Sequence, residues 1–167
     1  IDSETKPKII NGLSGSANDI EFLKNGDTFI VSTSNGKLMV GDHRQLFLKE
    51  LLSTKHEIKA LSIHPDGRVL AGATWSGQVL LINLSDLSIT TIADDKNSRI
   101  LSVKFSPDGR TLAYGVDDLV NKRGLVKLYD FSTRETRQFS GHRAAVTDVE
   151  FSPDGKLLAS AGSDMRL

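Results

Sequence analysis

The 167-residue chain contains no cysteine, and only 6% of its residues are aromatic, among them a single tryptophan. Without cysteine the chain can form no disulfide, no thiolate metal site and no cysteine nucleophile. No apolar run approaches the roughly 18–20 residues that a membrane-spanning helix requires, so no membrane association is predicted. An excess of either charge is also missing, because 21 basic and 21 acidic residues balance. This balance argues against a nucleic-acid partner, since dedicated nucleic-acid binders usually carry a basic excess.

The start of the chain also lacks the basic stretch followed by an apolar one that marks a signal peptide. Together with the absence of cysteine, which suits a reducing compartment, this predicts a cytoplasmic location. The first residue is Ile1, which is not a natural initiator, so we expect the chain to have been cut from a longer one. Hydrophobic residues make up 38% and charged residues 25% of the composition, as is typical of a globular domain.

What the sequence does contain is one motif in four versions: "FLKNGDTFIVS", "IHPDGRVLAGA", "FSPDGRTLAYG" and "FSPDGKLLASA". Their turn glycines, Gly26, Gly67, Gly109 and Gly155, are separated by 41, 42 and 46 residues. In such a turn Pro presets φ at the first corner, Asp bonds its own backbone, and Gly takes the left-handed conformation. A period of about 40–45 residues is that of a four-stranded propeller blade.

Each version is flanked by patterns typical of antiparallel strands. Before the turn, apolar residues alternate with others, as on a half-buried strand. After the turn, apolar and small residues run together, as on a strand buried on both faces. A second turn, a third apolar strand and a fourth, more polar strand follow in each unit. The alternating apolar pairs before the turns are Ile20/Phe22, Leu61/Ile63, Val103/Phe105 and Val149/Phe151.

We therefore predict an all-β fold of β-propeller blades, each built of four antiparallel strands. The whole chain, 1–167, would be one propeller segment, with blades at about 14–50, 54–93, 97–140 and 142–167, the last one incomplete. Residues 1–13 would be a spare outer strand of a neighbouring blade. Because one blade cannot bury both of its faces, and unpaired strand edges are unfavourable, the segment is expected to belong to a larger ring. A second copy completing the ring as a homodimer is the alternative.

The fourth version, in "GHRAAVTDVEFSPDGKLLASAGSD" at 141–164, resembles the WD-repeat (WD40-type) family of β-propellers. It has the initial Gly-His pair, the first-strand aspartate Asp148, the SPDG turn and the small residues of the second strand. At the position of the family's terminal Trp-Asp, the third version has Tyr129-Asp130, while the first two have diverged from it. The resemblance covers essentially the whole chain and implies four WD-type repeats.

The resemblance also implies a role for particular residues. In the family a His, a Ser or Thr, an Asp and the Trp form a hydrogen-bonded network, which maps onto His142, Ser160 and Asp164. The Trp position would lie beyond Leu167. With Asp148, these residues are interpreted as a structural blade network. The same His, Ser and Asp also suggest a catalytic triad, but the family network already accounts for them.

Other chemistry has little support in the sequence. The four histidines, His43, His56, His64 and His142, lack the spacing of a metal site. The acidic pair Asp94-Asp95 is interpreted as solvated loop charge, with a ligand contact as the alternative. No catalytic, cofactor-binding or metal-binding residue is predicted, and the chain is not expected to be an enzyme.

Two features stand apart from the repeat: Trp75, in the turn between second and third strands, and the insertion 117–123, which lengthens the same turn of the third blade. Trp75 could pack against a neighbouring blade or stand exposed as a binding anchor, and the sequence leaves both open. Alternating strand directions place these turns and the loops before each first strand on one rim, opposite the SPDG turns. The predicted partner-binding residues on this rim are His56, Trp75, Arg99, Lys122, Arg123 and Arg143.

This distribution predicts a non-catalytic scaffold that binds a protein or peptide partner, because aromatic and arginine side chains are enriched at interfaces. The alternative is a sensor or regulatory propeller within a larger multidomain protein, for example one linked to an ATPase or a kinase.

Overall fold

The computed structural model describes residues 9–166, and within them every regular element is a β-strand. Three sheets have four antiparallel strands in sequence order, here blades 1 to 3, and the hairpin of the last two strands is blade 4. The prediction of an all-β fold with four-stranded antiparallel blades is confirmed. The strands are β1 (Ala17–Phe22), β2 (Thr28–Thr33), β3 (Lys37–Asp42), β4 (Phe47–Ser53), β5 (Ile58–Ile63), β6 (Val69–Thr74), β7 (Gln78–Asn83), β8 (Ile89–Asp94), β9 (Ser98–Phe105), β10 (Thr111–Asp118), β11 (Arg123–Asp130), β12 (Thr136–Ser140), β13 (Val146–Phe151) and β14 (Leu158–Gly162).

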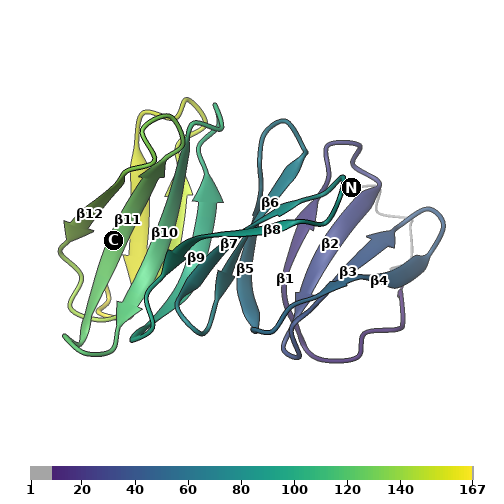
Figure 1. Ribbon diagram of the computed structural model, residues 1–167, viewed down its shortest axis with the longest axis horizontal. Helices are drawn as coiled ribbons and strands as arrows, with labels where there is room; N and C mark the ends of the chain where they lie inside the picture. Colours follow the sequence, from purple (N-terminus) through teal and green to yellow (C-terminus); the bar gives the residue numbers. More distant parts are fainter. Residues whose placement is uncertain (1–8, 167) are drawn as a thin grey trace.

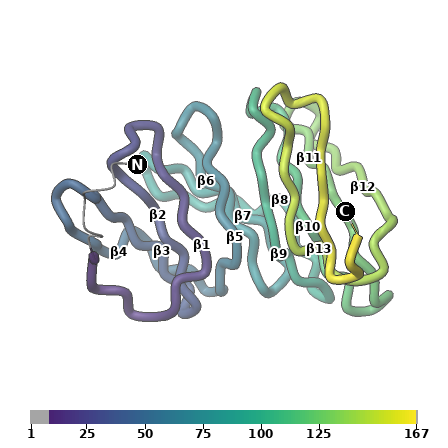
Figure 2. Tube along the Cα trace, turned by 180° about the vertical axis from the view of Figure 1, so that it is seen from behind, coloured from purple at the N-terminus to yellow at the C-terminus, as the bar shows by residue number. Residues whose placement is uncertain are grey.

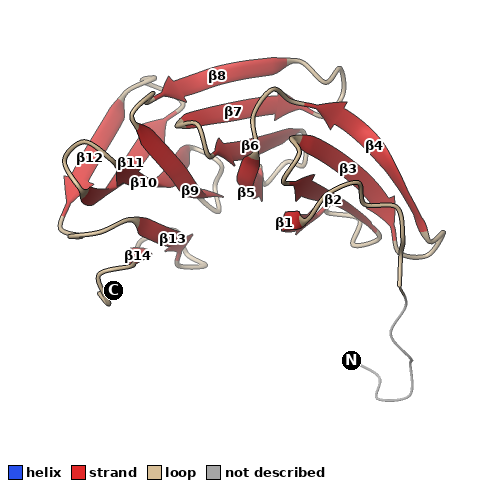
Figure 3. Ribbon diagram, turned by 90° about the horizontal axis from the view of Figure 1, so that it is seen from below, coloured by secondary structure: helices blue, strands red, loops and turns tan. Residues whose placement is uncertain are grey.

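The blades stand side by side in chain order (Figure 1, and from behind in Figure 2). Viewed from below, they form an open arc, with the fourth strands β4, β8 and β12 on its outside (Figure 3). The first strands of successive blades lie together: β1 contacts β5, β5 contacts β9, and β9 contacts β13. Within the described residues the arc does not close into a ring.

Burial between neighbouring blades explains the small residues of the second strands. In β6, "VLAGAT", Ala71 and Ala73 are fully buried and pack in one cluster with Ile100 of β9 and Val116 of β10. Short side chains on one blade leave room for the larger side chains of the next. The main core is therefore formed between the blades.

Hydrogen bonds from the inner strands add to this packing. Leu61 N in blade 2 donates to Asp19 Oδ2 in blade 1 at 2.7 Å. Phe105 N in blade 3 donates to Ser62 Oγ in blade 2 at 3.0 Å. Each bond supplies an acceptor for a backbone amide in the interior and fixes the height of one blade relative to the next.

The repeated turns have the predicted backbone. Gly109 and Gly155 have φ of 73° and 71°, in the left-handed region that favours glycine. The prediction of positive φ at both positions is confirmed.

The insertion in blade 3 is not simply a longer turn, as the sequence suggested. β10 and β11 have eight residues each, against six in the equivalent strands of blades 1 and 2. Asp117 faces Gly124 and Asp118 faces Arg123 in an unbroken ladder, so only 119–122 form the turn. The extra residues extend the hairpin because the ladder satisfies their backbone groups.

Two further expectations concern the first strands of the blades and the N-terminal segment. Val103 and Phe105 of β9 are buried, but Ile20 and Phe22 of β1 are half exposed because no described residue forms a blade on that side of β1. The predicted spare outer strand at 1–13 is not tested: residues 9–13 form no strand, and 1–8 lie outside the described residues.

Candidate functional site

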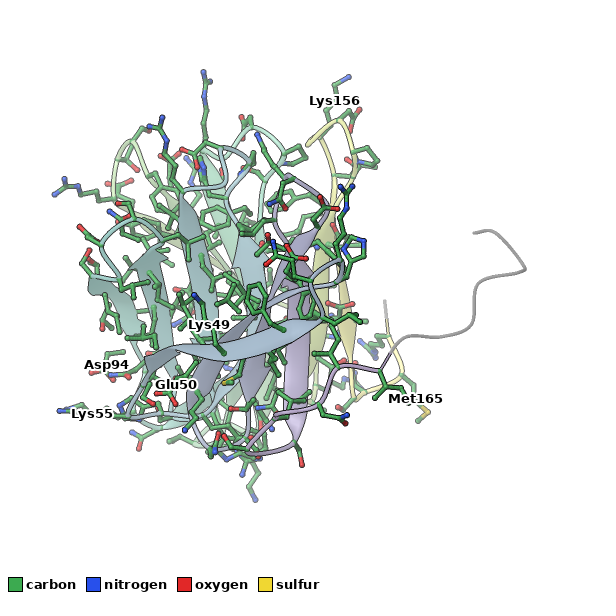
Figure 4. The ribbon with its side chains drawn as sticks, turned by 90° about the vertical axis from the view of Figure 1, so that its right-hand side faces the viewer. Lys49, Glu50, Lys55, Asp94, Lys156 and Met165 are labelled. Atoms are coloured by element: carbon green, nitrogen blue, oxygen red, sulfur yellow. The ribbon has the colours of Figure 1, made fainter. Side chains whose placement is uncertain are left out.

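The second turns of the blades and the loops before their first strands lie on the same rim of the arc, here called the Trp75 rim. Trp75 N donates to Glu57 O at 3.0 Å, and Leu119 N donates to Asn97 O at 3.1 Å. These backbone bonds hold each turn against the neighbouring loop. In Figure 4, Lys55 and Asp94 lie toward one end of the molecule, and Lys156 of an SPDG turn lies at the opposite end.

Trp75 is held by two cations from two different blades. Lys59 Nζ, on β5, lies 5.0 Å from the centre of the indole ring, and Arg99 Cζ, on β9, lies 4.3 Å from it. Trp75 nevertheless remains 42% exposed. The ring therefore contacts the neighbouring blade and also faces solvent, and its role as a binding anchor stays a prediction. Stacking with Arg and Lys fixes the ring in place.

Each cation of this stack has an acidic neighbour. Lys59 Nζ lies 2.8 Å from Glu57 Oε1, and this hydrogen bond is the main reason that the pKa of Glu57 lies below its usual value. Arg99 Nη1 lies 3.6 Å from Asp117 Oδ2. The latter distance exceeds that of a good hydrogen bond, so the Arg99 guanidinium is only loosely paired.

The turn of the insertion is ordered by one carboxylate, Asp118. Its Oδ1 accepts from the amides of Val120 (3.2 Å) and Asn121 (3.0 Å), and its Oδ2 lies 3.4 Å from Arg123 Nε. The Asn121 backbone bond is the largest of several hydrogen bonds that lower the pKa of Asp118. Lys122 stands exposed at the tip, with φ of 50°.

The other two predicted residues lie further along the rim. The Arg143 side chain is exposed in the loop before β13, and its backbone amide donates to Asp164 Oδ2 at 2.7 Å. His56 lies in the loop before β5, where its carbonyl accepts from Thr54 Oγ1 at 2.6 Å. Of the six predicted partner-binding residues, the structure brings only Trp75 and Arg99 into direct contact.

The blade network implied by the resemblance is present in blade 4. His142 Nδ1 donates to Asp164 Oδ1 at 2.9 Å, and His142 Nε2 lies 3.0 Å from Ser160 Oγ. The bonds from His142 and from the Arg143 amide lower the pKa of the Asp164 carboxyl from 3.8 to about 2. The Asp164 side chain is only 6% exposed. Because Asp164 ties the loop before β13 to the turn after β14, the arrangement favours a structural role.

Asp148, assigned to the same network, is not bonded to it. Its Oδ1 accepts from the Val149 amide at 2.9 Å, on the inner strand β13. Asp148 occupies the position that Asp19 occupies in β1, where the second carboxylate oxygen binds the next blade. The bond between blades is made by Asp19, whereas Asp148 bonds only to the amide of its neighbour Val149 within the described residues.

Three further observations bear on function. Among residues 9–166 no group of three or more His, Asp and Glu side chains is placed to hold a metal ion. Asp95 forms an ion pair with Lys127 of β11, so this half of the acidic pair is engaged within the molecule. In the described part of the chain no helix has the length and apolarity to span a membrane.

Sequence reasoning overlooked Lys59 and Asp118. Lys59 follows the buried Ile58, so strand alternation could have placed it on the other face of β5, near the axis of the arc. Its approach to Trp75 depends on the backbone bond between the turn and the preceding loop. Asp118 could have been suspected because Asp commonly accepts bonds from amides two and three residues ahead.

The fold defines a set of propeller-type blades, and comparisons with known proteins agree. Two regions of the chain, 48–83 and 133–167, match the WD40 family, described as WD domain, G-beta repeat. These two regions carry WD repeats, and WD40-repeat proteins generally serve as scaffolds for protein interactions.

Three curated relatives illustrate the range of similar proteins. Pre-mRNA-processing factor 19 homolog 2 of Arabidopsis thaliana is 26% identical over 93% of this chain and 30% of its own length. Echinoderm microtubule-associated protein-like 2 of Homo sapiens is 35% identical over 53% of the chain and 14% of its own length. U4/U6 small nuclear ribonucleoprotein PRP4 of Saccharomyces cerevisiae is 29% identical over 70% of the chain and 25% of its own length. The chain thus spans less than a third of the length of these relatives.

Proposed function

We propose that the chain is a non-catalytic scaffold that binds a protein or peptide partner on the Trp75 rim. The observation that carries the proposal is the 42% exposure of Trp75, although two cations lie against its ring. A tryptophan that is fixed and yet open to solvent loses little conformational entropy when a partner covers it. Tryptophan and arginine are also the residue types most enriched among interface hot spots.

The form of the two rims supports this choice. On the Trp75 rim, an open groove of about 460 Å³ lies between the loop 94–98 and the turn of the insertion. Ser98 lines this groove and is adjacent in sequence to Arg99, so a bound segment could contact the Trp75 stack and the groove together. The opposite rim consists of short, similar turns, which offer less to recognise.

Binding to peptides selected from a displayed library against the chain would test the proposal. Trp75→Ala is expected to weaken binding by roughly thirtyfold, about 2 kcal/mol, if Trp75 anchors the partner. Arg110→Ala and Lys156→Ala, on the opposite rim, are matched controls and should leave affinity within about twofold. Loss of binding in these controls, with none in Trp75→Ala and Arg143→Ala, would assign the partner to the other rim.

A regulatory role within a larger protein is the second candidate. The observation that favours it is the length of the relatives, of which this chain spans 30% or less. In that case the partner of the Trp75 rim would be another domain of the same polypeptide. Cross-linking from the Trp75 rim in the full-length protein would then give intramolecular products.

A further inference from the structure

We propose that the Trp75 rim binds an acidic peptide, with a carboxylate side chain of the peptide held by Arg99 and Lys59 over Trp75. The inference rests on the proposed function, because it specifies the chemistry of the partner at the same site. It follows from three features of the rim: the cation stack, the pairing of the acidic residues, and the contrast with the opposite rim.

The two cations of the stack differ in how closely they are paired. Lys59 and Arg99 lie 5.0 and 4.3 Å from the centre of the same indole ring, and Lys59 also has a close ion pair, with Glu57 Oε1 at 2.8 Å. Asp117, the acid next to Arg99, lies 3.6 Å from Nη1, which leaves the guanidinium donors without a short hydrogen bond to it. A guanidinium stacked on an aromatic ring presents its planar edge, the geometry that binds a carboxylate through two parallel hydrogen bonds.

Exposed basic side chains surround the Trp75 stack on this rim. Four exposed side chains on this rim form no ion pair within the described residues: Lys55, Lys96, Lys122 and Arg143. Among the acids of the same rim, Asp94 is exposed and forms no ion pair among residues 9–166, whereas the others are engaged inside the molecule. Asp95 pairs with Lys127, and Asp118 and Asp164 accept backbone amides. The neutral chain therefore presents a positive surface here, and an acidic partner is its electrostatic complement.

The opposite rim lacks this imbalance. Arg110 lies 4.0 Å from Asp108 and Lys156 lies 3.5 Å from Asp154. The exposed bases Lys24, Arg68 and Arg134 form no ion pair in the described part of the chain, but the acids Asp27, Asp66 and Glu135 lie in the same turns and balance their charge. Arg44, in the β3–β4 turn, pairs with Asp27 of the adjacent β1–β2 turn at 2.9 Å. Charge complementarity thus distinguishes the two rims and selects the one that also carries Trp75.

The test uses the full chain and three fluorescently labelled peptides of the same length, compared by anisotropy at about 0.1 M salt. The first contains Glu residues spaced by Gly and Ser, the second has Gln at every Glu position, and the third has phosphoserine at those positions. The Glu peptide is expected to bind at least tenfold more tightly than the Gln peptide. The phosphoserine arm shows whether a second source of the same anionic chemistry is accepted. Tighter binding of phosphoserine than of Glu would replace the carboxylate by a phosphate and overturn the proposal as stated.

Variants locate the site. The double variant Lys59→Gln/Arg99→Gln is expected to bind the Glu peptide at least tenfold more weakly. The matched control, Arg110→Gln/Lys156→Gln, removes the same charge from the opposite rim and should change the affinity for this peptide less than twofold. Asp117→Asn removes the internal competitor for Arg99 and is expected to tighten binding about threefold. Equal weakening by the two double variants would show non-specific attraction and overturn the proposal.

The outcomes separate this inference from the proposed function. Library peptides that are neutral or basic, but whose binding still depends on Trp75, would refute the acidic partner and leave the scaffold intact. Library peptides whose binding is unaffected by any change on the Trp75 rim would refute both.

Discussion

Gly109 and Gly155 occupy the same place in successive SPDG turns, yet their surroundings differ. A Cβ at Gly109 would lie 2.3 Å from His64 Nε2 of the neighbouring blade, whereas one at Gly155 would meet nothing closer than Pro107 Cδ at 3.5 Å. The His64 ring is itself held by an edge-on contact with Phe105 at 5.0 Å, so it has little room to move. The same turn therefore has an inter-blade contact in one copy and a nearly free surface in the other.

Alanine substitutions should reveal this difference. Gly155→Ala is expected to lower the free energy of unfolding by roughly 1–2 kcal/mol, the cost of the left-handed conformation alone. Gly109→Ala should cost more, because the clash with His64 adds to the same backbone strain. Chemical denaturation of both variants measures the two values, and equal costs would contradict the contact with His64.

Asp164 gives a pH-dependent prediction. Its pKa is about 2 in the folded protein against an ordinary 3.8, so its carboxylate stabilises the fold above about pH 4, and this contribution is lost as pH falls toward 2. The difference in Tm between the wild type and Asp164→Asn should be largest near neutral pH and shrink toward pH 2. Glu135→Gln, an exposed change in the β11–β12 turn, is the control and should show no such trend. A difference in Tm that is constant with pH would exclude the ionised network.

At the scale of single residues, the sequence related three residues that the structure brings together, His142, Ser160 and Asp164, but it assigned Asp148 to the same network wrongly and named only part of the candidate site. His142, Ser160 and Asp164 are close in sequence to one hairpin, so a pattern within one repeat was enough to relate them. The stack on Trp75 draws Lys59 from one blade and Arg99 from the next. Contacts between repeats depend on how the blades are rotated against each other, which a pattern within one repeat does not determine.

At the scale of the strand, β9 carries the interface between blades 2 and 3. Its Ile100 is fully buried and packs with Ala71, Ala73 and Val79 of blade 2. The side chain therefore belongs to blade 3 in sequence but stabilises the contact with blade 2. Truncating the Ile100 side chain is therefore expected to weaken the contact between blades 2 and 3 as well as the packing within blade 3.

Ile100→Ala is expected to lower the free energy of unfolding by roughly 2–5 kcal/mol, because the neighbouring alanines cannot expand to fill the cavity. Ile89→Ala, on the outer strand β8 where the side chain is half exposed, is the matched control and should cost less than about 1 kcal/mol. Unfolding in denaturant, followed by circular dichroism, gives both values. Similar costs at the two positions would mean that blades 2 and 3 do not share a core.

Elements were predicted well where the repeat dictated them and less well where it was interrupted. The turn-and-strand pattern located the first three strands of every complete blade, because apolar periodicity and turn chemistry agree there. The residues 117–123 contain acidic and basic side chains, which do not mark a strand. The structure extends the hairpin through them because backbone pairing with β11 continues beyond the apolar stretch.

At the scale of the whole molecule, the outer side of blade 1 is an open apolar flank. Ile20 and Phe22 are about half exposed, and an open groove of about 450 Å³ beside them is lined by Ile10, Leu13 and Leu48, among others. Exposed apolar surface of this kind favours association. We expect the flank to be covered in solution. Of the two arrangements predicted for this chain, a larger ring and a homodimer that completes the ring, the homodimer can be tested on the chain itself.

Light scattering tests this expectation. The chain should show twice its 18.2 kDa mass, and Ile20→Ser with Phe22→Ser should shift it toward the monomer. Ile89→Ser, on the outer strand β8, replaces a similarly exposed side chain and should leave the mass unchanged. A monomer of 18.2 kDa that unfolds cooperatively would contradict the dimer.

The hydrogen bonds between inner strands also have a consequence for synthesis. The bonds from Leu61 to Asp19 and from Phe105 to Ser62 join residues 42 and 43 positions apart, about one repeat in each case. A ribosome adds about 5–20 residues per second, so one repeat takes seconds to emerge, whereas a hairpin forms in about 1–10 μs. Each blade can therefore fold and attach to its predecessor while the next is still being made. Folding from the N-terminal end would shorten the time for which the nascent chain exposes unpaired strands, because each new blade can pack against one that has already folded.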